Sequence, residues 1–231
     1  MLFFDPVYLL FLAPGMLIAV WAQCKVKSSF AAAKRLRPQS GLSGAEAAER
    51  ILQGNGLHDV GIEPTRGGFL GDHYDPRART LRLSPDVYQG RTLAAVGIAA
   101  HEAGHALQHQ ARYAPLALRN GIVPMASLGS NLSWILLIAG MFMHLTGLVV
   151  AGLLLFSMVV LFQLINLPVE FNASTRARQV LLANGIITQA EEPAVAKVLN
   201  AAAMTYVAAT ITAVLQLLYF LLRSGLLGGR R

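Results

Sequence analysis

Two histidines and a glutamate stand close together in an alanine-rich, apolar stretch of the chain. His101 and His105 are four residues apart, and Glu102 directly follows His101. Residues four apart lie on one face of an α-helix, so both imidazoles can reach one Zn²⁺ at about 2.0–2.1 Å. Glu102 would then lie beside the metal, where it can accept a proton from a bound water. This HExxH spacing predicts a zinc metallopeptidase with Glu102 as the catalytic base.

A catalytic zinc needs a third protein ligand and one open position. The next acid after Glu102 is Glu170, which follows Pro168 at the end of an apolar segment. A carboxylate at a membrane border is costly without a partner, which favours Glu170 as the third ligand. Its alternative role is to stabilise a helix N-terminus. The rival third ligands are Asp72, His73, Asp75 and His109.

The motif must be held by a helix, and its surroundings predict one. Thr92 is a typical N-cap, and an alanine-rich helix is expected over residues 93–112. Ser43 and Glu46 have the spacing of a capping box, which predicts a second helix from Gly44 to about Gln53. Further helices are expected from Val169 to about Ala183, beginning at the break that Pro168 makes, and from Pro193 onward into an apolar segment.

Between the first two of these helices the sequence indicates a small sheet. Residues 57–65 can be extended, Gly67-Gly68 marks a turn, and residues 72–76 read as a polar turn or hairpin tip. Polar and apolar residues alternate from Arg79 to Leu83, as in a half-exposed strand. Leu81–Leu83 is either an edge strand against which an extended peptide pairs, or a strand that only completes the sheet.

The composition points to a membrane protein. Of the 231 residues, 55% are hydrophobic and only 13% are charged, whereas soluble domains carry about 25% charged residues. The net charge of +7 would suit nucleic acid or an anionic membrane surface, and the apolar content favours the membrane. We therefore expect the lipid bilayer, and no nucleic acid, as a partner. A single cysteine, Cys24, excludes an internal disulfide.

Four stretches approach the roughly 20 apolar residues that a spanning helix needs. The predicted organisation is spans at 3–22, 121–143, 148–169 and 201–222, a catalytic domain at 25–120, and a helical segment with the third zinc ligand at 170–200. The first span is expected to be an uncleaved anchor. The link at 144–147 is short, so the second and third spans form a hairpin. Most Lys and Arg residues near span ends then lie on the catalytic side, which the positive-inside rule makes cytoplasmic.

Five motifs in order resemble the YugP-type neutral zinc metallopeptidases, which are bacterial multi-pass membrane proteins. They are GDHYDPR at 71–77, LRLS at 81–84, HEAGH at 101–105, PVEFNASTRA at 168–177 and VLNAAAMTYVAA at 198–209. The chain more distantly resembles membrane gluzincins of the heat-shock and prenyl-protein-processing type, which add a downstream ExxxD pattern to HExxH. The resemblance implies a mainly α fold with about four transmembrane helices and a small α+β gluzincin-like catalytic domain containing a short hairpin or sheet.

The resemblance also implies one catalytic Zn²⁺ held by His101, His105 and Glu170, with Glu102 as general base. Four residues after Glu170 the chain has Ser174 where the gluzincins have Asp. In those relatives the Asp steadies a zinc-bound histidine, so Ser174 or Asn172 is expected to replace it. Candidates for stabilising the oxyanion are His73, Tyr74 and Arg176.

These observations together predict an endopeptidase of the bacterial plasma membrane, acting on peptide or membrane-protein substrates at the cytoplasmic surface. An alternative is an intramembrane site-2-type protease, which needs HExxH inside a spanning helix. Arg91 and Arg112 flank the HExxH helix, and its apolar run is too short to span. The non-enzymatic alternative is a zinc-stabilised membrane scaffold, for which Glu102 would be unnecessary. The oligomeric state is not predicted.

Overall fold

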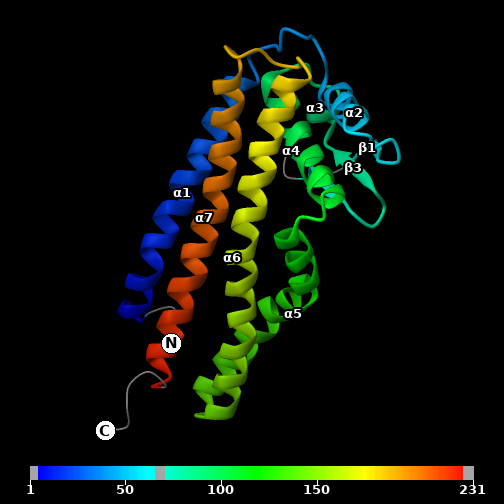
Figure 1. Cartoon of the computed structure of the whole chain (residues 1–231). Helices are drawn as coiled ribbons and strands as arrows, with labels where there is room; N and C mark the ends of the chain where they lie inside the picture. Colours follow the sequence, from blue (N-terminus) through cyan, green and yellow to red (C-terminus); the bar gives the residue numbers. More distant parts are fainter. Residues whose placement is uncertain (1–4, 66–70, 226–231) are drawn as a thin grey trace. The chain divides into compact units, whose positions relative to one another are not determined.

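The computed structural model describes residues 5–65 and 71–225 and shows a mainly helical chain with a small mixed sheet (Figure 1). Four of its helices are long and apolar enough to cross a membrane: α1 (Pro6–Ala33), α5 (Ala114–Phe142), α6 (Thr146–Ala183) and α7 (Glu192–Arg223). The shorter elements are α2 (Gly44–Gly54), β1 (Gly61–Pro64), β2 (His73–Asp75), β3 (Thr80–Leu83), α3 (Pro85–Tyr88) and α4 (Leu93–Gln110). The predicted fold class is therefore confirmed. Residues 3 and 4 of the first expected span and the Gly67-Gly68 turn lie outside the described residues.

The chain divides into two compact units, which we describe separately. The membrane unit comprises Ala117–Pro168 together with the part of α1 up to Ala22 and the part of α7 from Met204. The other unit comprises Gln23–Leu116 and Val169–Ala203, and so contains α2, α3, α4 and the whole sheet. We call it the catalytic unit because it contains the predicted catalytic domain. Both α6 and α7 thus contribute residues to each unit.

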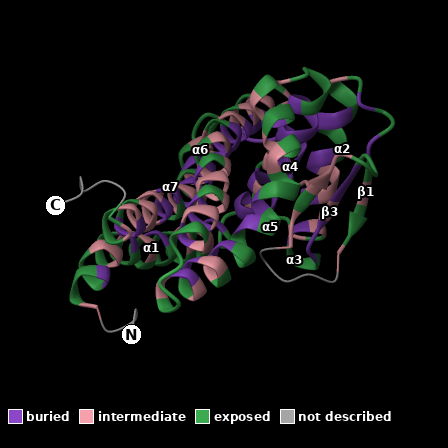
Figure 2. Cartoon of the chain, turned by 90° about the horizontal axis from the view of Figure 1, so that it is seen from below, coloured by how far each residue is buried: buried purple, intermediate pink, exposed green. Residues whose placement is uncertain are grey.

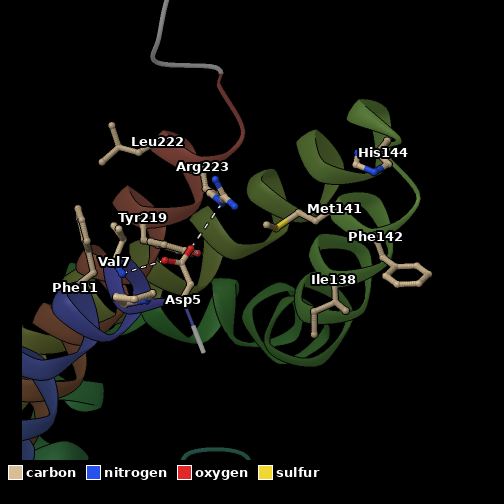
Figure 3. Close-up of a pocket in the computed structure, with 11 residues that line it drawn as sticks. Asp5, Val7, Phe11, Ile138, Met141, Phe142, His144, Tyr219, Leu222 and Arg223 are labelled. Carbon is tan, nitrogen blue, oxygen red and sulfur yellow. Dashed lines mark hydrogen bonds and ion pairs between the residues drawn. The ribbon is translucent and has the colours of Figure 1, made fainter. Parts of the chain in front are cut away.

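Helices of the membrane unit pack closely where they carry glycine. A Cβ at Gly15 would clash with Thr212, and one at Gly152 would lie 2.8 Å from Leu137. Such close approach is typical of membrane helices, whose association depends on van der Waals packing. At the end formed by the start of α1 and the end of α7, Tyr219 donates a hydrogen bond to Asp5 at 2.8 Å (Figure 3). Arg223 lies 3.7 Å from the same carboxylate, beside an open pocket of about 930 Å³.

The core of the catalytic unit forms around α4. Val96, Ala100, Ala103 and Leu107 are buried, and they pack with residues of α2, α6 and α7 in one hydrophobic cluster. Figure 2 marks the buried residues of α2, α4 and β3 in purple. The two predicted caps are present: Ser43 and Glu46 form the capping box of α2, and the Thr92 side chain accepts a hydrogen bond from Ala95 N–H. Both helix predictions are confirmed to within two residues at each end.

The sheet differs from the sequence prediction in two respects. Its order is β1-β3-β2, with β3 parallel to β1 and antiparallel to β2. The edge-strand interpretation of Leu81–Leu83 is therefore wrong, because β3 has a neighbour on each side. His73–Asp75 is a strand and not a hairpin tip. Its polar composition suits an edge, since a strand with one free edge does not need to be apolar.

α6 also corrects a prediction, because it continues through Pro168 without a new start. A proline removes one intrahelical hydrogen bond, and long apolar helices tolerate that loss. The residues that follow compensate through burial: Val169, Ala173, Ala177 and Leu181 are each fully buried and recur every four residues. This stripe packs into the catalytic unit, so the helix continues until Ala183, where Asn184 and Gly185 end it as expected.

The backbones of α4 and α6 come close together at Gly104. A Cβ at this position would lie 2.7 Å from the carbonyl oxygen of Ala173. Real Cβ atoms do not approach a backbone oxygen this closely, so the contact requires glycine. Gly104 lies between His101 and His105, and Ala173 lies one turn beyond Glu170. Because Gly104 has no side chain, the two helices that carry the predicted ligands can lie this close together.

We expect Gly104→Ala to destabilise the protein, although alanine is the better helix former. The added methyl group must displace the α6 backbone, and overpacking of this kind costs about 1–3 kcal/mol. Gly121→Ala in α5 is the matched control, because a Cβ there meets nothing within 4 Å. Thermal unfolding of the detergent-solubilised protein should show a lower Tm for Gly104→Ala and an unchanged or higher Tm for Gly121→Ala. Equal Tm values for the two variants would contradict the proposed contact.

Candidate metal centre

Three of the predicted ligands meet in the catalytic unit. His101, His105 and Glu170 each offer one ligand atom, and these atoms all lie within 4.8 Å of one another. Glu170 Oε2 is 3.2 Å from His101 Nε2 and 3.8 Å from His105 Nε2. Both ring nitrogens on α4 therefore face the carboxylate that α6 supplies. The side chains are largely shielded from solvent, with exposed fractions of 15%, 11% and 6%.

This cluster fits a tetrahedral zinc ion. Ligands that bind zinc at about 2.0–2.2 Å from tetrahedral corners lie about 3.3–3.6 Å apart, close to the separations above. Two imidazole nitrogens and one carboxylate oxygen form a donor set of catalytic zinc sites, in which a fourth position stays open for water. Bringing three such groups together in a buried place without a cation would be costly, which supports a metal at this position.

Glu102 lies beside the cluster on the same helix. Its Oε2 accepts a hydrogen bond from the Tyr74 N–H of β2 at 3.1 Å, so the sheet orients the carboxylate. Burial raises the pKa of Glu102 to about 7, and the neighbouring carboxylates Glu170 and Asp72 also raise it, while His101 lowers it. A carboxylate whose pKa is near neutrality can both accept and return a proton at neutral pH.

His105 is oriented by a residue that the sequence analysis did not identify. Gln108 is completely buried, and its amide nitrogen donates to Val169 O at 2.8 Å and to Asn172 Oδ1 at 3.0 Å. The amide oxygen must therefore face His105 Nδ1, which is 3.0 Å away. An oxygen can only accept, so Nδ1 carries the hydrogen and Nε2 keeps its lone pair for a metal.

The same chain of contacts extends one step farther. Asn172 Oδ1 also accepts a hydrogen bond from Arg176 Nε at 2.7 Å. The side-chain amide oxygen of Asn172 thus accepts from two donors, Gln108 on α4 and Arg176 on α6. The available sequence signal was the position of Gln108 three residues after His105, which places both side chains on the same face of the helix.

His101 has a partner of its own. Ser174 Oγ lies 3.2 Å from His101 Nδ1. Ser174 occupies the position where the distant relatives have Asp, so the expected replacement is geometrically in place. The two alternatives named from the sequence are both used: Ser174 contacts His101 directly, and Asn172 reaches His105 through Gln108.

The rival third ligands have other partners. Asp72 accepts hydrogen bonds from the backbone and hydroxyl of Ser84 at 2.6 and 3.2 Å, and burial raises its pKa. The Ala78 N–H and the Arg82 guanidinium hold Asp75 and lower its pKa to about 2. His109 lies 2.9 Å from the Tyr74 hydroxyl. None of these residues joins the cluster of His101, His105 and Glu170 among the described residues.

The three oxyanion candidates are placed differently around the site. His73 is exposed on β2 and its Nδ1 lies 2.8 Å from Gly71 O. The Tyr74 hydroxyl is engaged by His109, while its backbone contacts Glu102. Arg176 belongs to the chain of contacts behind His105. His73 therefore has the most accessible side chain of the three, and the oxyanion role stays a prediction for each.

Comparison with known proteins agrees with this geometry. A family model described as "Putative neutral zinc metallopeptidase" matches residues 8–225. A protein of Bacillus subtilis (strain 168) named "Putative membrane protease YugP" is 49% identical over 205 residues, which cover 89% of this chain and 91% of the relative. No solved structure matches the chain significantly. The chain therefore belongs to the family of neutral zinc metallopeptidases that this model describes.

Proposed function

We propose that the protein is a membrane-embedded zinc endopeptidase with one catalytic Zn²⁺ bound by His101, His105 and Glu170. The observation that supports this most strongly is the arrangement of the three ligand atoms within 4.8 Å of one another, with buried Glu102 beside them. A purely structural metal site has no use for an additional buried carboxylate. α4 is not among the candidate membrane spans of the described chain, which disfavours a site-2-type intramembrane protease.

The residues around the cluster supply the remaining parts of a peptidase. Bound zinc would polarise the scissile carbonyl and lower the pKa of a water ligand towards about 7. Glu102 accepts the proton of the attacking water and later delivers it to the leaving amine. The Tyr74 N–H keeps the carboxylate directed to the site before each transfer. Gln108 and Ser174 keep His105 and His101 in place, which limits the reorganisation needed during the reaction.

We propose that an extended peptide substrate lies along β2, the sheet edge next to α4. The N–H groups of Gly61 and Thr65 donate to β3, so Ile62 and Pro64 face the opposite, outer edge of β1. Pro64 has no N–H, and this edge is therefore poorly suited to pairing. On β2, the Tyr74 N–H points away from β3 towards Glu102, and its carbonyl is directed to the same side. A substrate strand along this edge would lie beside the catalytic carboxylate and would pair with the Tyr74 carbonyl, because the Tyr74 N–H is already bound to Glu102.

We also propose that the active site faces the cytoplasm of a bacterial plasma membrane. The support is the excess of Lys and Arg near the span ends that adjoin the catalytic unit, compared with the opposite ends.

The separate roles of the three proposed zinc ligands and of the proposed base Glu102 can be tested by measuring zinc content and peptide cleavage. We expect His101→Ala, His105→Ala and Glu170→Ala to lose bound zinc, because each removes one of three ligands. Glu102→Gln should keep the metal and lose cleavage by several orders of magnitude, because the amide cannot accept the proton. Elemental analysis of the purified protein measures bound zinc, and digestion of an unfolded test protein measures cleavage. Wild-type turnover by Glu102→Gln would contradict the peptidase assignment.

The role of Gln108 predicts a loss of zinc affinity without loss of a ligand. Gln108→Met has a similar length but cannot accept from His105, so zinc affinity should fall about 10–100-fold. Gln108→Glu keeps an acceptor for His105 but places a carboxylate oxygen against Val169 O and Asn172 Oδ1, so it should also bind zinc more weakly. Gln53→Met, at an exposed position of α2, is the control and should bind zinc normally. Competition with a chromophoric chelator gives the affinities. An unchanged affinity in Gln108→Met would show that His105 does not need this partner.

The sidedness can be tested with the single cysteine. Cys24 is exposed on α1 and lies at the end of the first predicted span, on the side predicted to be cytoplasmic. A membrane-impermeant thiol reagent should therefore fail to label it in intact cells and should label it in inverted vesicles. In a Cys24→Ser background, Leu145→Cys in the link between α5 and α6 provides the opposite case and should react from outside. Labelling of Cys24 in intact cells together with protection of Leu145→Cys would invert the topology.

A further inference from the structure

One face of α5 carries polar groups although the helix is apolar enough to span a membrane. Asn120, Pro124, Ser127 and Asn131 are exposed and follow one another at spacings of three or four residues, which places them on a single helical face. Ile138 and Phe142, nearer the end of the helix, line the open pocket beside Asp5 and Arg223 and are therefore not counted with them. We call Asn120, Pro124, Ser127 and Asn131 the α5 outer face.

The helix α6 packs on the opposite side of α5. Ala126, Gly129, Ser133, Leu137 and Gly140 are buried, and they too recur every three or four residues. A Cβ at Gly129 or Gly140 would meet α6 backbone atoms at 2.8 or 2.7 Å, so this face contacts α6 directly. Asn131 is two residues from both Gly129 and Ser133, about half a helical turn away. Its side chain therefore projects away from the unit.

Polar side chains on this face are energetically unfavourable inside a bilayer. Asn131 is 11 residues before Phe142, the end of α5, or about 16 Å at 1.5 Å per residue, near the middle of a hydrocarbon core about 30 Å thick. The side chains of Asn131 and Ser127 have no hydrogen-bond partner within residues 5–65 and 71–225. Lipid tails can satisfy neither side chain.

We propose that the α5 outer face binds the α5 outer face of a second copy of this chain, giving a dimer within the membrane. An asparagine amide donates and accepts, so two Asn131 side chains can satisfy each other across a twofold axis along the membrane normal. A second copy presents this amide at the same depth, which an unrelated helix would do only if it carried a matching polar residue. Interhelical hydrogen bonds from Asn and Ser are a known means of association in membranes.

Cysteine crosslinking tests the face without removing the amide. In a Cys24→Ser background, Ser127→Cys lies on the α5 outer face, and Leu132→Cys is an exposed α5 position about 100° around the helix from Asn131 and about 140° from Ser127. In purified full-length protein reconstituted at low density in phosphatidylcholine vesicles, mild oxidation should crosslink Ser127→Cys and leave Leu132→Cys monomeric. Equal crosslinking of the two, or none of either, would overturn the proposal.

The contribution of Asn131 is measured by energy transfer between labelled copies at increasing lipid dilution. Asn131→Leu should weaken dimerisation about tenfold, and Asn131→Gln, which keeps the amide, should stay near wild type. Because residue 131 is exposed, leucine suits the lipid and should leave thermal stability unchanged. An unaltered dimer in Asn131→Leu, or a monomeric wild-type protein at every dilution, would contradict the proposal. Neither outcome bears on the zinc site.

Discussion

The close approach of two helix backbones at Gly104 is the contact on which the candidate metal centre depends. His101 and His105 are near in sequence and would be brought together by any helix. Glu170 is 65 residues beyond His105 and can join them only if α6 lies against α4. The missing side chain at Gly104 allows the Ala173 carbonyl to come within a distance that a Cβ would forbid. Because Gly104 lies within the histidine motif, the contact is made at the height of the ligands themselves.

Much of this could be predicted from local sequence. The capping box at Ser43 and Glu46, the Thr92 cap and the alanine-rich run made the helices predictable, since caps and helical spacing act within a few residues. The histidine pair followed from helical periodicity. Glu170 could be named because it was the first acid after the motif and was otherwise costly at a membrane border. The structure adds the distances, which a sequence cannot supply.

The errors arose where long-range contacts decide the outcome. A strand's place in a sheet depends on which segments pair with it, so β3 could not be recognised as central from its alternation alone. Pro168 is a reliable helix breaker only where nothing else stabilises the helix, and the buried stripe beyond it outweighs its cost. Gln108 was overlooked because a lone glutamine has no motif. Its importance lies in two acceptors on α6 that fix which way its amide points.

Pro64 affects whether catalytic units of neighbouring copies in one membrane can aggregate. Proteins held in two dimensions reach high local concentrations, and exposed strand edges then invite intermolecular sheet growth. The outer edge of β1 offers the Ile62 N–H but no donor at Pro64, so neighbouring copies cannot extend a continuous ladder through it. The edge of the sheet that lies farther from α4 is thus protected against aggregation by a single residue without an N–H.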